Sequence, residues 1–289
     1  METSDFLSEH FLTAFAEFSL TLKGTRTRRD YLSYCRQVCA FAKKDFLLLT
    51  QQDASAWRNS LISSGNLKTG TIATKISALT SVSSFLLEKG LITYNIFEEL
   101  YVERPDTYLK LSDIPSLQEL DALLVAAKDN DVLFAILSLI IRVGLTASEA
   151  VRIRRDDLAL FDNGTAKLTI YKGKYARTVM IPADVVEILE TRLKGGDYIF
   201  YNQYGNPLRL PNLQAVLKKT EIAAGMSRCW TLQDIRHAAL LFMLKGGASQ
   251  EAVAVHAGVD GRWMFRYNKV MNEYPVVLAD YQFIRLKEK

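Results

Sequence analysis

One hairpin constrains the fold of this chain more than any other feature. Two runs rich in β-branched residues, Ala166–Tyr171 and Thr178–Ile181, flank the turn Lys172-Gly173-Lys174, which is the pattern of a β-hairpin. Tyr198–Tyr201 is a candidate third strand, and nearly all other segments show the apolar spacing of helices. We therefore expect a mainly α (α+β) protein with a small antiparallel β-sheet.

The first hundred residues are expected to be helical. Apolar side chains recur there at helical spacing, and Gly24 opens a turn that carries the nearby arginines. Asp53 is expected to be the N-cap of a short third helix. The predicted helices are Phe6–Leu22, Tyr31–Lys44, Asp53–Gly65 and Thr71–Lys89.

A length of 289 residues favours two domains over one. The stretch 105–115 is polar, contains two prolines and lacks periodicity, so we expect a linker there. Ser116 and Glu119 then form a capping box that opens the next helix. The expected organisation is a helical domain at 1–104, a linker at 105–115 and a mixed domain at 116–289.

Composition limits the cellular location, the cofactors and the partners that we expect for the protein. The longest nearly unbroken apolar run, Val132–Ile141, is half of the roughly 20 residues that span a membrane, and no signal peptide opens the chain. We expect a cytoplasmic protein without a membrane partner. Three cysteines without CxxC spacing predict neither a disulfide framework nor a zinc site, and no cofactor or metal is expected. The net charge of +4 is too mild to identify a partner.

Four motifs follow one another in the second half of the chain. They are Gly144-Leu145-Thr146-Ala147-Ser148-Glu149, the hairpin with Lys172, Thr231-Leu232-Gln233-Asp234-Ile235-Arg236-His237, and a late tyrosine at position 267. In this order they resemble the tyrosine recombinase family of phage integrase and Xer-like proteins. The resemblance covers nearly the whole chain and implies a helical core-binding (SAM-like) domain at 1–104, followed by a catalytic-type domain.

The resemblance implies a specific chemistry. In such enzymes a tyrosine attacks a DNA phosphodiester and leaves a covalent 3′-phosphotyrosyl link and a free 5′-hydroxyl. The transition state is strongly anionic, so the site needs preorganised cationic donors, for which arginine is well suited. The family uses two arginines, two His or His/Trp donors and a hairpin lysine that protonates the leaving oxygen.

Four residues match this catalytic set. Tyr267 aligns with the nucleophile, Arg236 with the second arginine and Glu149 with the acidic residue that braces the site. Lys172 aligns with the hairpin lysine, with Lys174 as the alternative. Each has a structural alternative, such as core packing for the tyrosine or a helix-surface position for the arginine.

Three positions depart from the family pattern. Thr146 stands where the first arginine belongs, and with Glu149 it forms a capping box that needs no catalytic explanation. Gln233 stands at the motif histidine, and Gly258 at the later His or Trp. The constellation is therefore degenerate, and strand cleavage is expected to be impaired or lost.

Four residues are candidate substitutes for the missing donors. Arg142 and Arg152 lie within two helical turns of Thr146 and are candidates for the missing guanidinium. His237 and His256 are further candidates, but we expect both on helix surfaces.

DNA binding does not require the complete catalytic set. Basic clusters are scattered along the sequence, and the family fold would gather several on one face around a duplex. The expected DNA-binding residues are Arg26, Arg28, Arg29, Lys43, Lys44, Arg154, Lys174 and Arg177.

The tail Glu273–Lys289 is too apolar for a disordered end. We expect it either to mediate self-association, or association with another recombinase, or to pack on its own domain. The sequence thus predicts a partner of double-stranded DNA in site-specific recombination or integration. An active recombinase using Tyr267 and a helical protein-interaction scaffold without DNA binding remain the alternatives.

Overall fold

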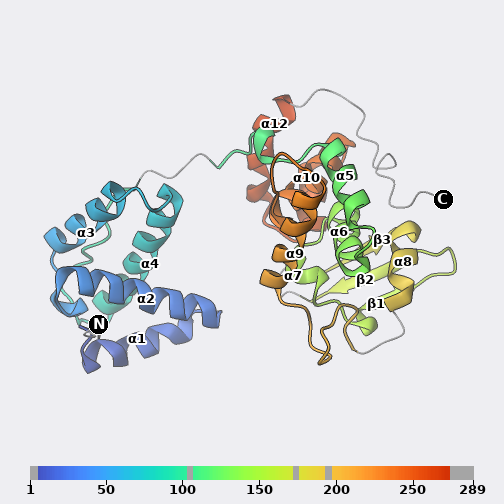
Figure 1. Ribbon diagram of the computed structural model, residues 1–289. Coiled ribbons are helices and arrows are strands. Elements are labelled where there is room, and N and C mark those ends of the chain that lie inside the picture. Colours follow the sequence, from blue (N-terminus) through green and yellow to red (C-terminus); the bar gives the residue numbers. More distant parts are fainter. Residues whose placement is uncertain (1–5, 103–106, 172–175, 193–196, 274–289) are drawn as a thin grey trace. The chain divides into compact units, whose positions relative to one another are not determined.

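The computed structural model describes residues 6–102, 107–171, 176–192 and 197–273. The chain divides into two compact units, Met1–Asp106 and Thr107–Lys289 (Figure 1). Each unit has a hydrophobic core of its own, as expected of a separate domain. Part of the segment expected as a linker packs on the second unit, where the Leu109 N–H donates to the Arg266 carbonyl at 2.9 Å.

The first unit consists of helices packed around a core rich in phenylalanine, including Phe11, Phe15 and Phe18. Its elements are α1 (Glu9–Thr21), α2 (Thr25–Ala42), η1 (Phe46–Leu48), α3 (Gln51–Ser63) and α4 (Thr69–Glu88).

Two local expectations for this unit are wrong. The second helix begins at Thr25, six residues before the predicted start, so the arginines that follow Gly24 lie in its first turns. The N-cap of α3 is Thr50, whose hydroxyl accepts from the Asp53 N–H, while the Asp53 carboxylate accepts from the Thr50 N–H. Asp53 is thus the acidic partner of a capping box, one turn inside the helix.

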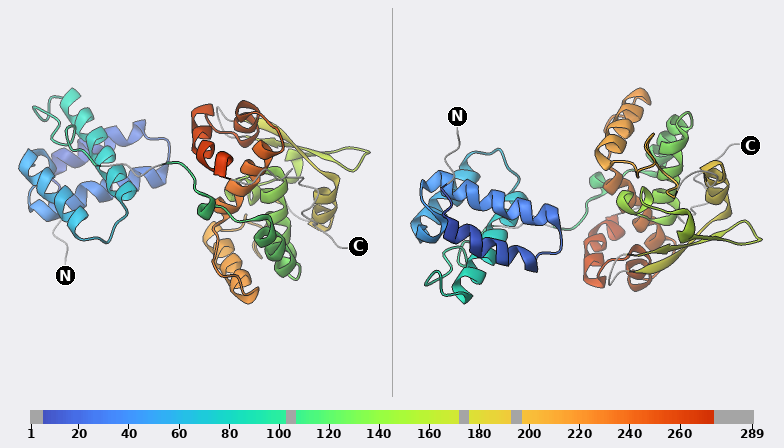
Figure 2. Two further views of the ribbon diagram at one scale, coloured as in Figure 1. Left: turned by 90° about the horizontal axis from the view of Figure 1, so that it is seen from above. Right: turned by 90° about the horizontal axis from the view of Figure 1, so that it is seen from below.

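The second unit is built around one buried helix. Helix α6 (Asp131–Val143) is apolar on almost every side and contacts α5 (Leu117–Ala127), α8 (Ala183–Leu189), α9 (Leu210–Ala223) and α10 (Leu232–Lys245). Both views of Figure 2 place the sheet and α8 on one side of α6 and α9 on another. The remaining helical elements are η2 (Leu111–Asp113), α7 (Ala147–Ala150), η3 (Arg155–Asp157), η5 (Glu190–Arg192), α11 (Gln250–Ala257), η6 (Gly261–Tyr267) and α12 (Asn268–Glu273).

The sheet has three antiparallel strands in the order β1 (Leu158–Leu160), β2 (Ala166–Ile170) and β3 (Arg177–Ile181). The predicted hairpin is present as β2 and β3, with Leu168 opposite Val179. The prediction of a third strand at 198–201 is wrong, because that segment forms only isolated bridges and the third strand is β1.

The structure thus confirms the expected mainly helical fold with a small antiparallel sheet. None of the helices in the described ranges is both long and apolar enough to cross a membrane.

Candidate active site

Arg236 lies at the centre of the candidate site, on the second turn of α10. Its side chain is buried, Nε donates to the Gly144 carbonyl at 2.9 Å, and Nη2 donates to the Ala257 carbonyl at 2.7 Å. The guanidinium therefore joins the C-terminal ends of α6 and α11. Burial lowers the pKa of Arg236, while Glu149 and Tyr267 raise it. Among the described residues Nη1 has no hydrogen-bond acceptor, so this nitrogen is available to a ligand.

Thr146, which we align with the first arginine of the family, is the N-cap of α7. Its hydroxyl accepts from the Glu149 N–H at 3.1 Å, and the Glu149 carboxylate accepts from the Thr146 N–H at 2.9 Å. Thr146 Oγ1 also lies 3.1 Å from Ser148 Oγ. The predicted capping box is confirmed, and the Thr146 side chain is fully engaged in it.

The Arg177 guanidinium lies within electrostatic reach of Arg236. The sequence did not predict this arginine at the site. Arg177 Nη1 and Nη2 donate to the two carboxylate oxygens of Glu149 at 3.0 and 3.1 Å, and Nε donates to the His256 carbonyl at 2.6 Å. The side chains of Arg177 and Glu149 are only 6% and 8% exposed. Burial raises the pKa of Glu149, but hydrogen bonds from Arg177 and Thr146 outweigh it and bring the pKa to about 2.

Arg177, one of the expected DNA-binding residues, is thus engaged in a buried ion pair. Its side chain is withdrawn from solvent and its charge is neutralised by Glu149. The alternation of residues in β3 could have predicted this burial, because Arg177 lies on the same face of the strand as the buried Val179 and Ile181.

Gly258 has a structural role that the alignment of motifs did not show. It is the left-handed C-cap of α11, with φ of 63°, a conformation that favours glycine. A Cβ at this position would lie 2.8 Å from Arg177 Cζ, so the guanidinium occupies the space of a side chain. A side chain at position 258 would therefore require the Arg177 guanidinium to move.

Tyr267, the candidate nucleophile, ends η6 and is fully buried. Its hydroxyl lies 2.7 Å from His237 Nδ1. The His237 ring stacks on Trp263 with centroids 5.4 Å apart and planes inclined by 13°. The Trp263 and Tyr267 rings are T-shaped to each other with centroids 5.7 Å apart. Burial raises the pKa of Tyr267, against the opposing effect of Arg236 and Arg266.

His237 is a core residue, contrary to the expected helix-surface position. Burial, together with Arg266 and Arg236, lowers its pKa to about 4, so the imidazole is neutral at pH 7. Gln233, one helical turn earlier, places Nε2 at 3.2 Å from His237 Nε2. His256 is half-buried, and its Nε2–H donates to the Val143 carbonyl at 2.7 Å.

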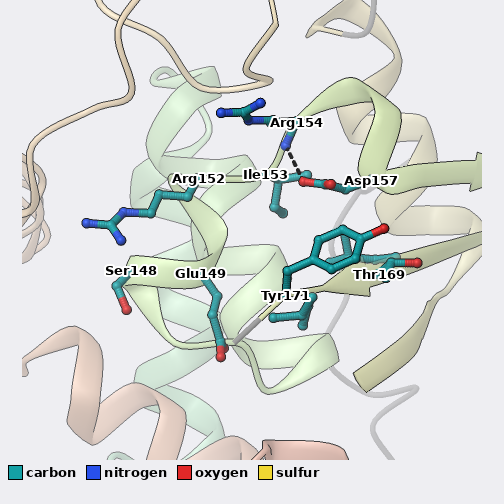
Figure 3. Close-up of a pocket in the computed structure, with 10 residues that line it drawn as sticks. Ser148, Glu149, Arg152, Ile153, Arg154, Asp157, Thr169 and Tyr171 are labelled. Atoms are coloured by element: carbon teal, nitrogen blue, oxygen red, sulfur yellow. Dashed lines mark hydrogen bonds between the residues drawn. The ribbon is translucent and has the colours of Figure 1, made fainter. Parts of the chain in front are cut away.

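The two proposed substitutes for the first arginine do not converge on Arg236. Arg142 pairs with Asp184 of α8 at 3.1 Å. Arg152 lines a cavity of about 460 Å³ together with Ser148, Glu149 and residues of η3 and β2. Within that cavity Arg152 and Glu149 point in different directions (Figure 3).

The expected DNA-binding residues of the first unit differ in their exposure and in the contacts that their side chains make. Arg29 and Lys43 are exposed, and Arg26, also exposed, lies 3.7 Å from Asp30. Arg28 donates to the Leu22 carbonyl at 3.1 and 2.9 Å, and Lys44 is paired with Asp53 at 2.8 Å.

Other expected residues lie on the second unit or outside the described residues. Arg154 is exposed and stacks on the Tyr198 ring. Lys172 and Lys174 lie outside the described residues, as does the tail beyond Glu273. In the described part of the chain no three His, Cys, Asp or Glu side chains are grouped to hold a metal ion.

Comparison with known proteins agrees with the motifs. Residues 116–261 match the family model described as the phage integrase family, and the chain belongs to this family. Tyrosine recombinase XerC of Listeria innocua serovar 6a is 29% identical over 197 residues, 63% of this chain and 65% of the relative. Tyrosine recombinase XerD of Oceanobacillus iheyensis is 27% identical over 198 residues, 64% of this chain and 66% of the relative. The chain thus spans just under two thirds of the length of these two relatives.

Solved structures show the same fold at low identity. A lambda integrase tetramer bound to a Holliday junction gives a TM-score of 0.70 at 16% identity, covering 86% of this chain and 76% of that one. The Tn1549 transposon integrase in complex with a circular intermediate DNA gives 0.70 at 15% identity, covering 89% and 93%.

Proposed function

We propose that this protein binds duplex DNA and acts in site-specific recombination or integration, with weakened strand cleavage. Family membership supports the first part, and the XerC and XerD relatives are named as tyrosine recombinases. The contacts made by the residues of the candidate site support the second part, which is weakened cleavage.

The proposal of weak cleavage rests on one observation: the candidate site lacks one arginine, and the Arg177 guanidinium, which lies within electrostatic reach of Arg236, is already paired. Thr146 replaces the first arginine and its hydroxyl caps α7. The second guanidinium, that of Arg177, is paired at both terminal nitrogens with Glu149. Of these two guanidinium groups, only that of Arg236 keeps a nitrogen without a hydrogen-bond acceptor among the described residues. Loss of a single transition-state donor slows a reaction by roughly 10²–10³-fold, and further losses add to this non-additively.

The burial of Tyr267 also favours slow cleavage. For strand cleavage the Tyr267 oxygen must bond to phosphorus while the bond from phosphorus to the 5′-oxygen breaks, and Lys172 is the residue we assign to protonate that oxygen. Because Tyr267 is fully buried, the segments that cover it have to open before its oxygen meets a phosphate.

DNA binding itself depends on exposed cations that remain available. Arg29 and Lys43 on the first unit, and Arg152 and Arg154 on the second, are exposed. Phosphate contacts by such residues release counterions, so the affinity should fall steeply with salt.

One observation favours an active recombinase as the second candidate. Tyr267 and Glu149 each lie within electrostatic reach of Arg236 although the three come from separate segments, as a catalytic site requires. Self-association, or association with another recombinase, through the tail 274–289 remains part of the proposal, and that tail lies outside the described residues.

DNA binding is tested by fluorescence anisotropy with a random-sequence duplex at increasing salt. We expect binding at 50 mM salt that weakens steeply with added salt and is reduced in a variant with Arg29→Gln and Lys43→Gln. The matched control is Lys89→Gln, which removes an exposed cation paired with Glu17. No binding at 50 mM salt would contradict the proposal and favour the protein-interaction scaffold.

A further inference from the structure

Three side chains form a continuous hydrogen-bonded chain that ends at the candidate nucleophile. Gln233 Nε2 lies 3.2 Å from His237 Nε2, and His237 Nδ1 lies 2.7 Å from Tyr267 Oη. Gln233 and His237 are one turn apart on α10, whereas Tyr267 comes from η6, thirty residues later. The chain begins at the exposed Gln233 and ends inside the core.

The direction of these hydrogen bonds follows from the chemistry of the groups. In the orientation of the Gln233 amide that brings Nε2 to the imidazole, this nitrogen donates, and a neutral imidazole accepts at its Nε2. The single proton of that imidazole is then on Nδ1, which donates to the Tyr267 oxygen. Gln233 thereby selects one of the two tautomers of His237.

The surroundings keep this imidazole in place. His237 is stacked on Trp263, which also packs against the Tyr267 ring, and Arg266 lies over the Trp263 ring at 4.1 Å. The ring of His237 therefore has little freedom to rotate and exchange its two nitrogens.

We propose that His237 is a positioning residue that donates its Nδ1–H to the Tyr267 oxygen, and that Gln233 fixes the tautomer this requires. In this tautomer His237 cannot take the phenol proton, because Nδ1 already carries one, so its role is to orient the oxygen and not to deprotonate it. The hydrogen bond favours the phenolate form and limits the directions in which the oxygen lone pairs point. The role in cleavage rests on the proposed function, but the tautomer does not.

The tautomer is tested by ¹⁵N NMR of the full-length protein labelled at histidine. The chain has three histidines, so His237→Asn identifies the His237 signals by their loss. We expect Nδ1 to be protonated and Nε2 unprotonated at pH 7. A protonated Nε2 with a bare Nδ1 would overturn the proposal.

The role of Gln233 is tested in the same spectrum. Gln233→Leu removes the donor at nearly constant size and should give a mixture of the two tautomers. Gln37→Leu, on α2 in the other unit, is the control and should leave the His237 signals unchanged. An unchanged tautomer in Gln233→Leu would show that the glutamine does not select it, and would contradict that half of the proposal.

The positioning role is tested with nicked DNA that traps a tyrosyl adduct. His237→Leu should slow adduct formation about fivefold to tenfold, as expected for one lost hydrogen bond. His237→Asn should restore part of the rate, because its amide can donate from nearly the position of Nδ1. Equal rates in both variants and the wild type would overturn the positioning role. If the wild type forms no adduct at all, residual cleavage is absent, and the NMR result alone decides the hydrogen-bond assignment.

Discussion

The Glu149 carboxylate binds the Arg177 guanidinium through both of its oxygens, at 3.0 and 3.1 Å. This buried pair joins α7 to β3, and the bond from Arg177 Nε to the His256 carbonyl extends the connection to α11. The pair therefore holds together three segments that surround Arg236. The same contacts neutralise the charge of Arg177, which lies within electrostatic reach of Arg236.

The first prediction concerns the stability that this pair provides. Arg177→Leu should lower the free energy of unfolding by about 3–5 kcal/mol, because it leaves the Glu149 charge buried without its partner. The measurement is urea denaturation of the wild type and the variant.

The control for this experiment is Arg262→Leu. Arg262 pairs with Asp260 but its side chain is 92% exposed, so its replacement should change the stability by no more than about 0.5 kcal/mol. Equal effects of the two variants would show that the Arg177–Glu149 pair does not brace the site.

The second prediction is a pH dependence that comes from Glu149. Its pKa falls from the ordinary value of 4.5 to about 2 on folding, so the unfolded chain binds the proton more readily. The stabilising contribution is complete above pH 4.5 and is lost as the pH falls toward 2. Glu149→Gln should therefore be less stable than the wild type at pH 7, and the two should converge at low pH. A difference that stays constant from pH 7 to pH 3 would contradict the assignment.

The third prediction concerns the glycine that makes room for Arg177. Gly258→Ala should be destabilised twice, by about 1–2 kcal/mol for the left-handed backbone and by a further 1–3 kcal/mol, roughly, for the collision with the guanidinium. Gly225→Ala isolates the backbone effect, because Gly225 has φ of 67° and no atom within 4 Å of its hypothetical Cβ. Thermal unfolding of both variants measures the difference. Equal losses would mean that Arg177 moves aside without cost.

The fourth prediction follows from the capped position of Thr146. Thr146→Arg places a guanidinium where the family carries its first arginine, and should raise covalent adduct formation by about 10²–10³-fold if the absence of this donor limits cleavage. The loss of the cap should lower the stability by about 1 kcal/mol. Thr50→Arg, which removes the equivalent cap of α3, should lower the stability to the same extent without raising adduct formation. No gain in the Thr146 variant would place the defect elsewhere.

Local sequence patterns predicted the parts of the fold that depend on neighbouring residues. The capping boxes at Ser116 and Thr146 each involve groups three residues apart, and both are present. The hairpin was equally recognisable from its β-branched runs. The cap of α3 was misplaced because Thr50 and Asp53 are both capable of capping, and the pattern alone does not choose between them. Strand β1 was missed because it is short and two of its residues are exposed.

The contacts that define the site depend on distant segments and were not predictable in the same way. Arg177 and Glu149 are 28 residues apart, and His237 and Tyr267 are 30 apart. The parity of β3 indicated that Arg177 faces inward, but nothing local identified Glu149 as its partner. His237 was assigned to a helix surface because its contact with Tyr267 exists only once η6 packs against α10.

The central claim is that this protein binds DNA but cleaves it weakly, and covalent trapping tests it most directly. The protein is incubated with a pool of nicked duplexes that carry random sequence around the nick, and adducts are resolved on a denaturing gel beside Tyr267→Phe. We predict that the wild type binds the pool but forms only a small amount of adduct above the Tyr267→Phe background. An abundant adduct that disappears in Tyr267→Phe would contradict the claim and identify an active recombinase.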